Sequence, residues 1–257
     1  MTRLAVNTAL ITDAACCIGL VFAKAYTRQG ARLAIADVDA ARAREAADGL
    51  GPAAVAVKMG VTHQDSTDTA VSGVAAKFGQ IDVLINDAAL VTAASIVEFD
   101  RADADRIFDV DVEGTFFMMQ AIATHMIDHG IKSRIINMAR QVGRRGEPLV
   151  AGYCATKATV ISLTQSAEQN LIECGIKVNA ISPVVVDGEH WGGVDALFAK
   201  YEGQAPGQRK KEGGDAVPFG RMGTANDLTG MLVFLASNEA GYIVAPTYNV
   251  AGRQWIH

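Results

Sequence analysis

The chain has 257 residues, of which 50% are hydrophobic and 20% charged, and its formal net charge is −5. The negative charge argues against a nucleic-acid partner, and the absence of an apolar run of about 18 residues argues against a membrane span. The N-terminus shows no signal-peptide pattern and the four cysteines show no metal or scaffold spacing, so we expect a cytoplasmic protein.

Short β-rich apolar runs alternate with longer helical segments, and no linker or repeat interrupts them, so we expect a single domain over residues 1–257. Strands are expected at Thr8–Thr12, Ala31–Asp37, Ala53–Val57, Ile81–Asn86, Arg134–Met138 and Lys177–Ile181. The main helices are expected at Ile18–Gln29, Ala40–Leu50, Val112–His129 and Tyr153–Cys174. This alternation predicts an α/β fold: a Rossmann-like, doubly wound parallel sheet with helices on both faces. Ligands of such sheets bind at the carboxyl ends of the strands.

The regular alternation stops between about residues 187 and 215. A helical stretch is expected there only around Asp195–Tyr201, and a long segment of this kind is typical of a lid or a disordered loop. His190 and Trp191 are candidates to cover a substrate, although simple packing of the lid explains them equally well. We interpret the basic run Arg209–Lys211 as a solvated face, because acidic residues follow it.

Tyr153 and Lys157 are the most informative pair in the chain. On a helix, a spacing of four puts both side chains on one face. A lysine ammonium beside a phenol favours the phenolate, which can exchange a proton with an alcohol or a ketone near neutral pH. The pair taken alone is a weak signal, because two such residues on a surface helix are common.

Asp37 ends the second expected strand. An acidic side chain at this point can hydrogen-bond an adenosine ribose and repel a 2′-phosphate, so the sequence predicts NAD over NADP. The alternative is that Asp37 caps the helix that follows it.

Two further groups of residues are candidate sites. His125 and His129 lie one helical turn apart but have no third ligand nearby, so we expect no metal site. Cys16 and Cys17 lie at a helix N-terminus, where a thiolate is stabilised and reactive. A redox sensor is one interpretation of these cysteines, and buried fillers of a turn are the other.

Several motifs in order along the chain carry a family resemblance. They are Ala9–Thr12, Asp37, Asn86–Ala89, Ile135–Ala139, Tyr153–Lys157 and Val178–Pro183. With these motifs the chain resembles the short-chain dehydrogenase/reductase family over essentially its whole length. Within that family, the blocks Asp187–Trp191, Val217–Gly223 and Tyr242–Val250 resemble bacterial polyol (sorbitol) dehydrogenases.

The resemblance implies roles for individual residues. Tyr153 would be the general base in alcohol oxidation, and Lys157 would support it and hold the nicotinamide ribose. Arg140 stands where the family has a serine that hydrogen-bonds the reacting oxygen, and Asp111 stands where it has an asparagine of the proton relay. The implied cofactor contacts are Thr12, Ile18, Gly19, Asp37, Val61, Asn86, Tyr153, Lys157, Pro183 and Val186. Candidates for substrate contact are Glu147, His190 and Trp191.

The cofactor loop departs from the family pattern. Of the three glycines in Thr-Gly-x-x-x-Gly-x-Gly, this chain keeps only Gly19. Asp13 brings a negative charge to the expected diphosphate site and Cys17 brings a Cβ atom, and either change costs roughly 1–3 kcal/mol. Asp87 replaces the second asparagine of the Asn-Asn-Ala motif. The changes gather at the site while the strand cores remain intact.

Two functions are consistent with this pattern. The first is an NAD-dependent oxidoreductase that interconverts a polyol or similar secondary alcohol and its ketone, with weakened turnover because Arg140 replaces a small hydroxyl. The second is a catalytically inactive family member that acts as a binding or assembly subunit. The resemblance also implies a homotetramer built through the two long central helices, where Val112–His129 and Val160–Leu171 carry apolar residues.

Overall fold

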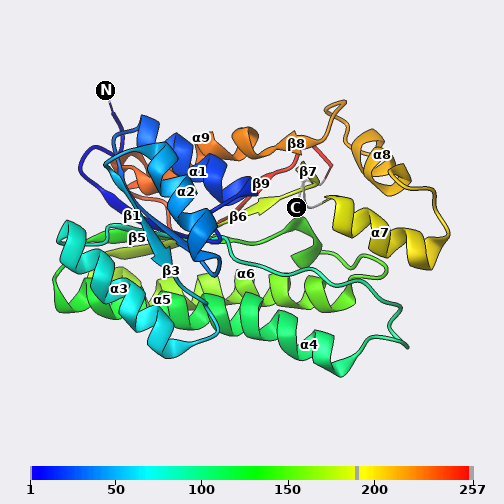
Figure 1. The fold of residues 1–257 in the computed structure, drawn as a ribbon, viewed down its shortest axis with the longest axis horizontal. Helices are drawn as coiled ribbons and strands as arrows, with labels where there is room; N and C mark the ends of the chain where they lie inside the picture. The colour runs from blue at the N-terminus through cyan, green and yellow to red at the C-terminus, as the bar shows by residue number, and fades with distance from the viewer. Residues whose placement is uncertain (1, 189–190, 255–257) are drawn as a thin grey trace.

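The computed structural model describes residues 2–188 and 191–254. Its main sheet has seven parallel strands in the order β3-β2-β1-β4-β5-β6-β9 (Figure 1). They are β1 (Thr8–Thr12), β2 (Arg32–Asp37), β3 (Ala54–Lys58), β4 (Val83–Asn86), β5 (Ser133–Met138), β6 (Ile176–Pro183) and β9 (Thr247–Val250). The strand order reverses between β1 and β4, which is where a doubly wound sheet opens a ligand crevice. The predicted fold class is confirmed.

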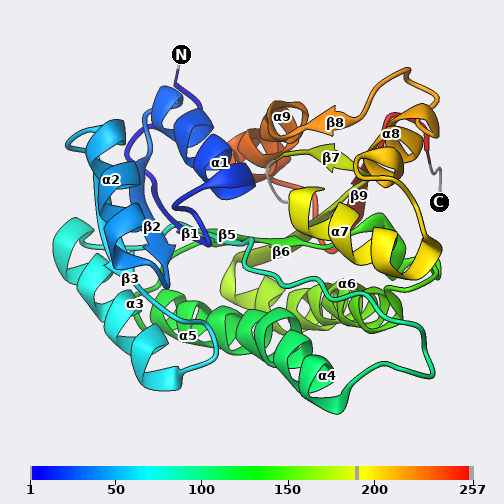
Figure 2. The ribbon, with the colours of Figure 1, turned by 45° about the vertical axis from the view of Figure 1, so that its right-hand side comes forward.

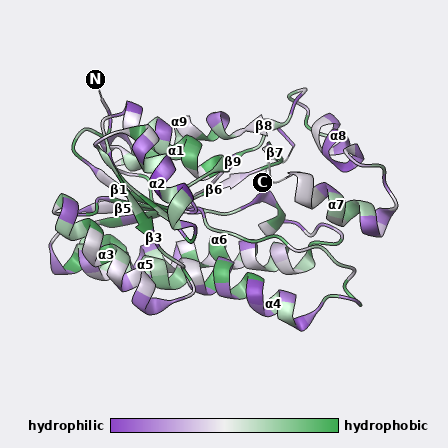
Figure 3. Ribbon diagram, viewed as in Figure 1, coloured by the Kyte–Doolittle hydropathy of each residue, from purple (hydrophilic) through white to green (hydrophobic). Residues whose placement is uncertain are grey.

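The strands lack polar-apolar alternation because helices cover both faces of the sheet. All residues of β1, β4 and β5 are buried. Figures 1 and 2 show one layer on each side of the sheet. One layer holds α1 (Cys17–Arg28), α2 (Ala40–Leu50) and α9 (Ala225–Ala236), and the other holds α3 (Gln64–Phe78), α5 (Thr115–Asp128) and α6 (Ala151–Leu171). Figure 3 shows hydrophobic residues concentrated in the strands and polar residues on the helices that border solvent.

The segment expected to be one helix from Val112 has a more elaborate structure. Helix α4 (Arg101–Phe108) runs into a π-helical turn, Asp109–Gly114, before α5 begins. A Cβ atom at Gly114 would lie 2.6 Å from Cγ2 of Val61, so glycine permits the close approach of this turn to the loop after β3. π-helical turns are frequent at functional sites, and this one carries Asp111 into the interior.

The expected lid contains two helices, α7 (Trp191–Glu202) and α8 (Gln208–Asp215), which lie beside the carboxyl ends of the strands (Figure 2). The short strands β7 (Val186–Asp187) and β8 (Gly223–Thr224) pair at its base. Asp195 organises the turn between the helices, because its carboxylate accepts hydrogen bonds from the backbone N–H groups of Gly207 and Lys210. In the described part of the chain, no helix is long and apolar enough to cross a membrane.

Candidate active site

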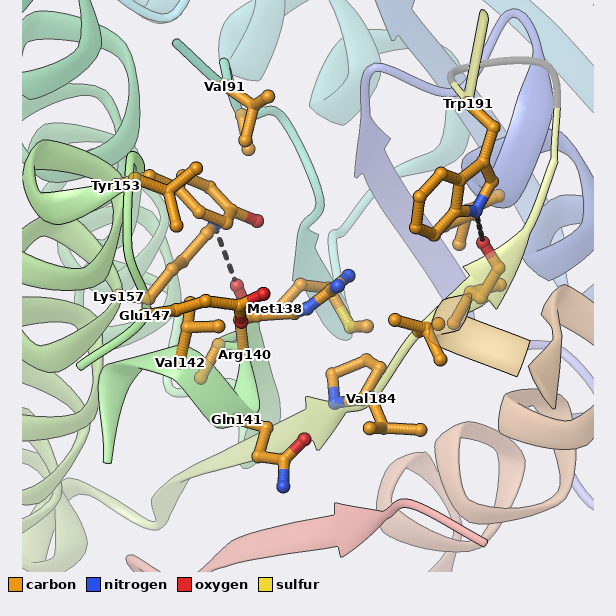
Figure 4. A pocket seen from close by; sticks show the side chains of 18 of the residues that line it. Val91, Met138, Arg140, Gln141, Val142, Glu147, Tyr153, Lys157, Val184 and Trp191 are labelled. Atoms are coloured by element: carbon orange, nitrogen blue, oxygen red, sulfur yellow. Dashed lines mark hydrogen bonds between the residues drawn. The ribbon is translucent and has the colours of Figure 1, made fainter. Parts of the chain in front are cut away.

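A cavity of about 740 Å³ lies at the carboxyl ends of the central strands. Residues that follow β1, β4, β5 and β6 line one side, and residues of α7 and α8 line the other. Its volume falls within the range of small-molecule sites, about 300–1,000 Å³. Figure 4 shows several of its side chains, including Tyr153, Lys157, Arg140 and Glu147.

Tyr153 and Lys157 both face this cavity from α6, as their spacing predicts. The Nζ atom of Lys157 lies 5.6 Å from the centre of the Tyr153 ring. It donates a hydrogen bond of 3.1 Å to the backbone oxygen of Met138, the last residue of β5 (Figure 4). The lysine side chain is almost fully buried, so it holds α6 and β5 in a fixed relation.

Asp111 lies behind this pair and is fully buried. Its Oδ2 atom is 3.8 Å from Nζ of Lys157 and accepts a hydrogen bond from Oγ1 of Thr156, and its Oδ1 atom accepts one from the N–H of Leu90. Desolvation raises the pKa of Asp111, and the Lys157 ammonium opposes that rise. Asp111 therefore lies close to Lys157, although it does not line the cavity itself.

Arg140 follows β5 in an extended conformation and lines the cavity. Its backbone is fixed, because its oxygen accepts a hydrogen bond from the N–H of Gly143. Glycine is required at that position, since a Cβ atom on Gly143 would lie 2.6 Å from the backbone carbon of Lys157. Arg140 is thus held next to the chain segment that anchors Lys157.

The lid contributes charged and aromatic groups to the cavity. Arg209 of α8 forms an ion pair of 2.6 Å with Glu147, and its guanidinium lies 4.6 Å from the centre of the Phe198 ring. The interpretation of Arg209–Lys211 as a solvated face is therefore wrong for Arg209, whose side chain reaches inward across the cavity. Trp191 is nearly buried and donates a hydrogen bond of 2.8 Å from Nε1 to the oxygen of Val186 (Figure 4).

The loop between β1 and α1 has backbone conformations typical of glycine at two positions that carry other residues. Asp13 and Cys17 have φ angles of 54° and 53°, in the left-handed region that favours glycine. Gly19 is required, because a Cβ atom there would lie 2.4 Å from the backbone oxygen of Asp13. No side chain caps the N-terminus of α1 within the described chain, and Cys17 and Ile18 of its first turn line the cavity.

Asp13 and Asp87 place two carboxyl groups at this end of the cavity. Desolvation, with a further contribution from the charge of Asp37, raises the pKa of Asp13 to about 6. Desolvation and the charge of Asp13 raise the pKa of Asp87 to about 8, against the opposing effect of Lys157. Asp87 therefore carries a proton at neutral pH, and a protonated carboxyl can donate a hydrogen bond as an amide does.

Asp37 is nearly buried, and its carboxylate is bound to the protein backbone. Oδ2 accepts a hydrogen bond from the N–H of Ala15 and Oδ1 accepts one from the N–H of Asp39. The alternative in which Asp37 caps the next helix is wrong: the cap of α2 is Asp39, whose side chain accepts hydrogen bonds from the N–H groups of Ala41 and Arg42. Asp37 shapes the cofactor loop instead.

The residues predicted from the sequence divide into two groups. Those that line the cavity are Ile18, Arg140, Glu147, Tyr153, Lys157, Pro183, Val186 and Trp191. Thr12, Gly19, Asp37, Val61, Asn86 and Asp111 are not among the lining residues and lie beneath or beside them. His190 lies outside the described residues.

Two of the recessed residues hold the crevice in shape. Thr12 accepts hydrogen bonds at Oγ1 from the N–H groups of Asp87 and Ala88, and so joins the end of β1 to the end of β4. Asn86 donates from Nδ2 to Oδ1 of Asn137, and so joins β4 to β5. These bonds fix the relative positions of three strand ends that border the cavity.

The surroundings of Cys16 argue against the redox-sensor interpretation, and the interpretation as a buried filler is wrong for Cys17, which is exposed. Burial, together with its contact with Cys17, raises the pKa of Cys16 to about 12, so its thiolate is disfavoured rather than stabilised. This leaves packing in the rebuilt turn as the explanation of Cys16. Among the described residues, no group of three or more His, Cys, Asp or Glu side chains is arranged to hold a metal ion.

The sequence missed several lining residues, among them Arg145, Val184, Arg209 and Gln254. Arg145 lies two residues before Glu147, and Val184 follows a quoted motif, so proximity to those motifs was a usable signal. Arg209 had no such signal, because its inward direction depends on how α8 packs against the cavity.

Comparisons with a family model, with curated proteins and with solved structures agree with one another. A family model described as enoyl-(acyl carrier protein) reductase matches residues 14–252. The chain is 58% identical over 254 residues to sorbitol dehydrogenase of Cereibacter sphaeroides and 50% identical over 254 residues to galactitol 2-dehydrogenase of Agrobacterium fabrum, and each match covers 99% of both chains. A solved structure of NAD+-bound xylitol dehydrogenase is similar with a TM-score of 0.92 and 28% identity, and covers 97% of this chain and 99% of that one.

The seven-stranded parallel sheet, the Tyr153–Lys157 pair at its carboxyl edge and these similarities over nearly the full length agree with one another. The chain belongs to the short-chain dehydrogenase/reductase family.

Proposed function

We propose that this protein is an NAD-dependent oxidoreductase that interconverts a polyol or similar secondary alcohol and its ketone. The observation that carries the proposal is the placement of Tyr153 and Lys157 in one cavity with the N-terminus of α1. The full-length similarity to sorbitol and galactitol dehydrogenases supports a polyol as the substrate.

The residues present fit a dinucleotide. The loop after β1 has the left-handed conformations at Asp13 and Cys17, and the uncapped end of α1 offers N–H groups to a diphosphate. Ile18, Pro183 and Val186 line the same cavity and would contact the cofactor, and the buried Asp37 shapes the adjoining loop and brings negative charge that disfavours a 2′-phosphate. The opposing factor is the Asp13 carboxyl, which is mostly ionised at neutral pH because its raised pKa is about 6.

The mechanism assigns one task to each side chain. When bound, NAD supplies the hydride acceptor. The phenolic oxygen of Tyr153 takes the hydroxyl proton of the alcohol, and the Lys157 ammonium lies 5.6 Å from the centre of its ring. Asp111 and the Met138 oxygen hold Lys157 in place. The aromatic and aliphatic side chains of the lid limit access of water to the cavity.

Weakened turnover is part of the proposal. Arg140 occupies the position of a small hydroxyl donor, and the loss of one well-aimed donor lowers the rate by about 10²–10³. The proposal also includes a homotetramer, because Phe116, Phe117 and Ile127 of α5 are exposed in the single chain. It further includes a location in the cytoplasm. Size-exclusion chromatography with light scattering tests the tetramer.

Titration of the purified protein with NADH, followed through energy transfer from its tryptophans and by calorimetry, is the first test. Saturable micromolar binding, weaker binding of NADPH and NAD-dependent oxidation of sorbitol or galactitol would support the proposal. A folded protein that binds no NADH up to millimolar concentration would refute it and leave a non-catalytic binding or assembly subunit.

A further inference from the structure

Arg140 differs from the other basic residues of the site in its surroundings. Lys157 has Asp111 and the Met138 oxygen as partners, and Arg209 has Glu147. The guanidinium of Arg140 makes no hydrogen bond and no ion pair with any residue in the described ranges, and the residue lines the cavity. A guanidinium at a cavity wall that has no protein partner is available to bind an acceptor that enters the cavity.

The acidic residues of the cavity do not supply that acceptor. Glu147 pairs with Arg209, and Glu212 accepts hydrogen bonds from Gln204 and Gln208. Asp87 carries a proton at neutral pH, since its pKa is raised to about 8. Asp13 lies at the cofactor end and forms no hydrogen bond or ion pair with Arg140.

The position of Arg140 brings its charge to the same cavity as Tyr153, the proposed proton acceptor. It lies two residues after Met138, whose backbone oxygen holds Lys157, and it lines the same cavity as Tyr153 (Figure 4). The bond from the Gly143 N–H fixes the backbone of Arg140, so its side chain extends from a rigid point. Guanidinium groups bind carboxylate and phosphate oxygens in pairs of parallel hydrogen bonds.

We infer that the substrate is an anionic polyol, whose carboxylate or phosphate group is bound by Arg140 while its secondary hydroxyl meets Tyr153. This inference rests on the proposed oxidoreductase function and names the substrate class of that same site. It also gives Arg140 a positive role in specificity at a position where a small donor is otherwise expected.

The test compares NAD-linked oxidation of neutral sorbitol with that of gluconate, which carries a carboxylate, and of sorbitol 6-phosphate. We expect kcat/KM to be higher for one anionic probe, and the better probe identifies the acidic group. Substitution of Arg140→Gln should lower the ratio of anionic to neutral kcat/KM by about 10- to 100-fold, and Arg140→Lys should retain part of it. Arg144→Gln is the matched control, because it removes an exposed arginine that does not line the cavity.

Calorimetric titration of the NADH-saturated protein with both anionic probes gives a readout that needs no turnover. Binding of an anionic probe that is lost in Arg140→Gln would support the anion site. If the same protein oxidises none of the probes, the proposed redox function would be refuted while the anion site stands. Turnover of sorbitol with no preference for either anionic probe would overturn the inference and leave the proposed function intact. An unchanged ratio in Arg140→Gln would overturn it as well.

Discussion

Asp87 offers the sharpest test of the electrostatics of the site. Its ordinary pKa of 3.8 rises to about 8 in the folded protein, chiefly through desolvation. The folded state binds this proton more tightly than the unfolded chain does. The contribution of Asp87 to the free energy of unfolding is therefore fully present below pH 3.8. That stability is lost as the pH rises toward 8. The Asp87→Asn variant has a neutral side chain of the same shape and escapes this loss.

The magnitude follows from the shift. Between 3.8 and neutral pH lie about three pKa units, each worth about 1.4 kcal/mol, which gives an upper limit of about 4 kcal/mol. Asp87 is partly accessible from the cavity, and solvent screening reduces this to about 2 kcal/mol. For a chain of this size, that corresponds to a rise in Tm of about 4–8 °C for Asp87→Asn near pH 7.

The assay is thermal and urea unfolding of the parent and Asp87→Asn from about pH 5 to about pH 9. The variant should gain stability relative to the parent as the pH rises, and the difference should level off above pH 8. Asp48→Asn, an exposed carboxylate on α2, is the control and should show no such trend. A difference between Asp87→Asn and the parent that stays constant with pH would refute the conclusion that Asp87 carries a proton in the folded protein.

Four further predictions concern the same site. Tyr153→Phe should lower kcat by about 10²–10⁴ while NADH binding, measured by fluorescence, persists. Asp111→Ala should destabilise the protein by about 3–5 kcal/mol in urea unfolding, because it leaves the Lys157 ammonium buried without its partner. Gly143→Ala should cost at least about 1–3 kcal/mol and lower kcat, since its Cβ would meet the backbone of Lys157. NADH affinity, followed by calorimetry, should weaken as the pH rises through about 6 and Asp13 ionises, and Asp13→Asn should remove that dependence.

The strands and the common placement of Tyr153 and Lys157 at the cavity could be predicted because their signals are local. Buried apolar runs give β1, β4 and β5, and a spacing of four residues places Tyr153 and Lys157 on one helical face. The last strand, β9, gave no such signal, because it is a short edge strand whose residues are only partly buried. The boundaries of β6 and α5 also differ from the expected ones by one to three residues.

The parts that could not be predicted depend on packing between segments far apart in the chain. The π-helical turn at Asp109–Gly114 exists where Gly114 meets Val61, which lies more than 50 positions earlier. The inward course of Arg209 depends on Glu147, 62 positions away. The proton on Asp87 reflects the desolvation of one carboxyl and its distance from another, and no sequence pattern encodes either quantity.

The unusual residues at the site alter its charge with little disturbance of its frame. Asp13 and Cys17 keep the left-handed backbone of the loop, and Asp87 keeps the shape of an amide when it is protonated. Arg140 changes more, because it brings a charge and extra volume while its backbone stays bound to Gly143. Thr12 joins the ends of β1 and β4, so these strand ends keep their positions. We therefore expect the unusual residues to affect which substrates bind in the cavity. In particular, we expect the unpaired guanidinium of Arg140, in the cavity that Tyr153 also lines, to affect substrate preference rather than the fold.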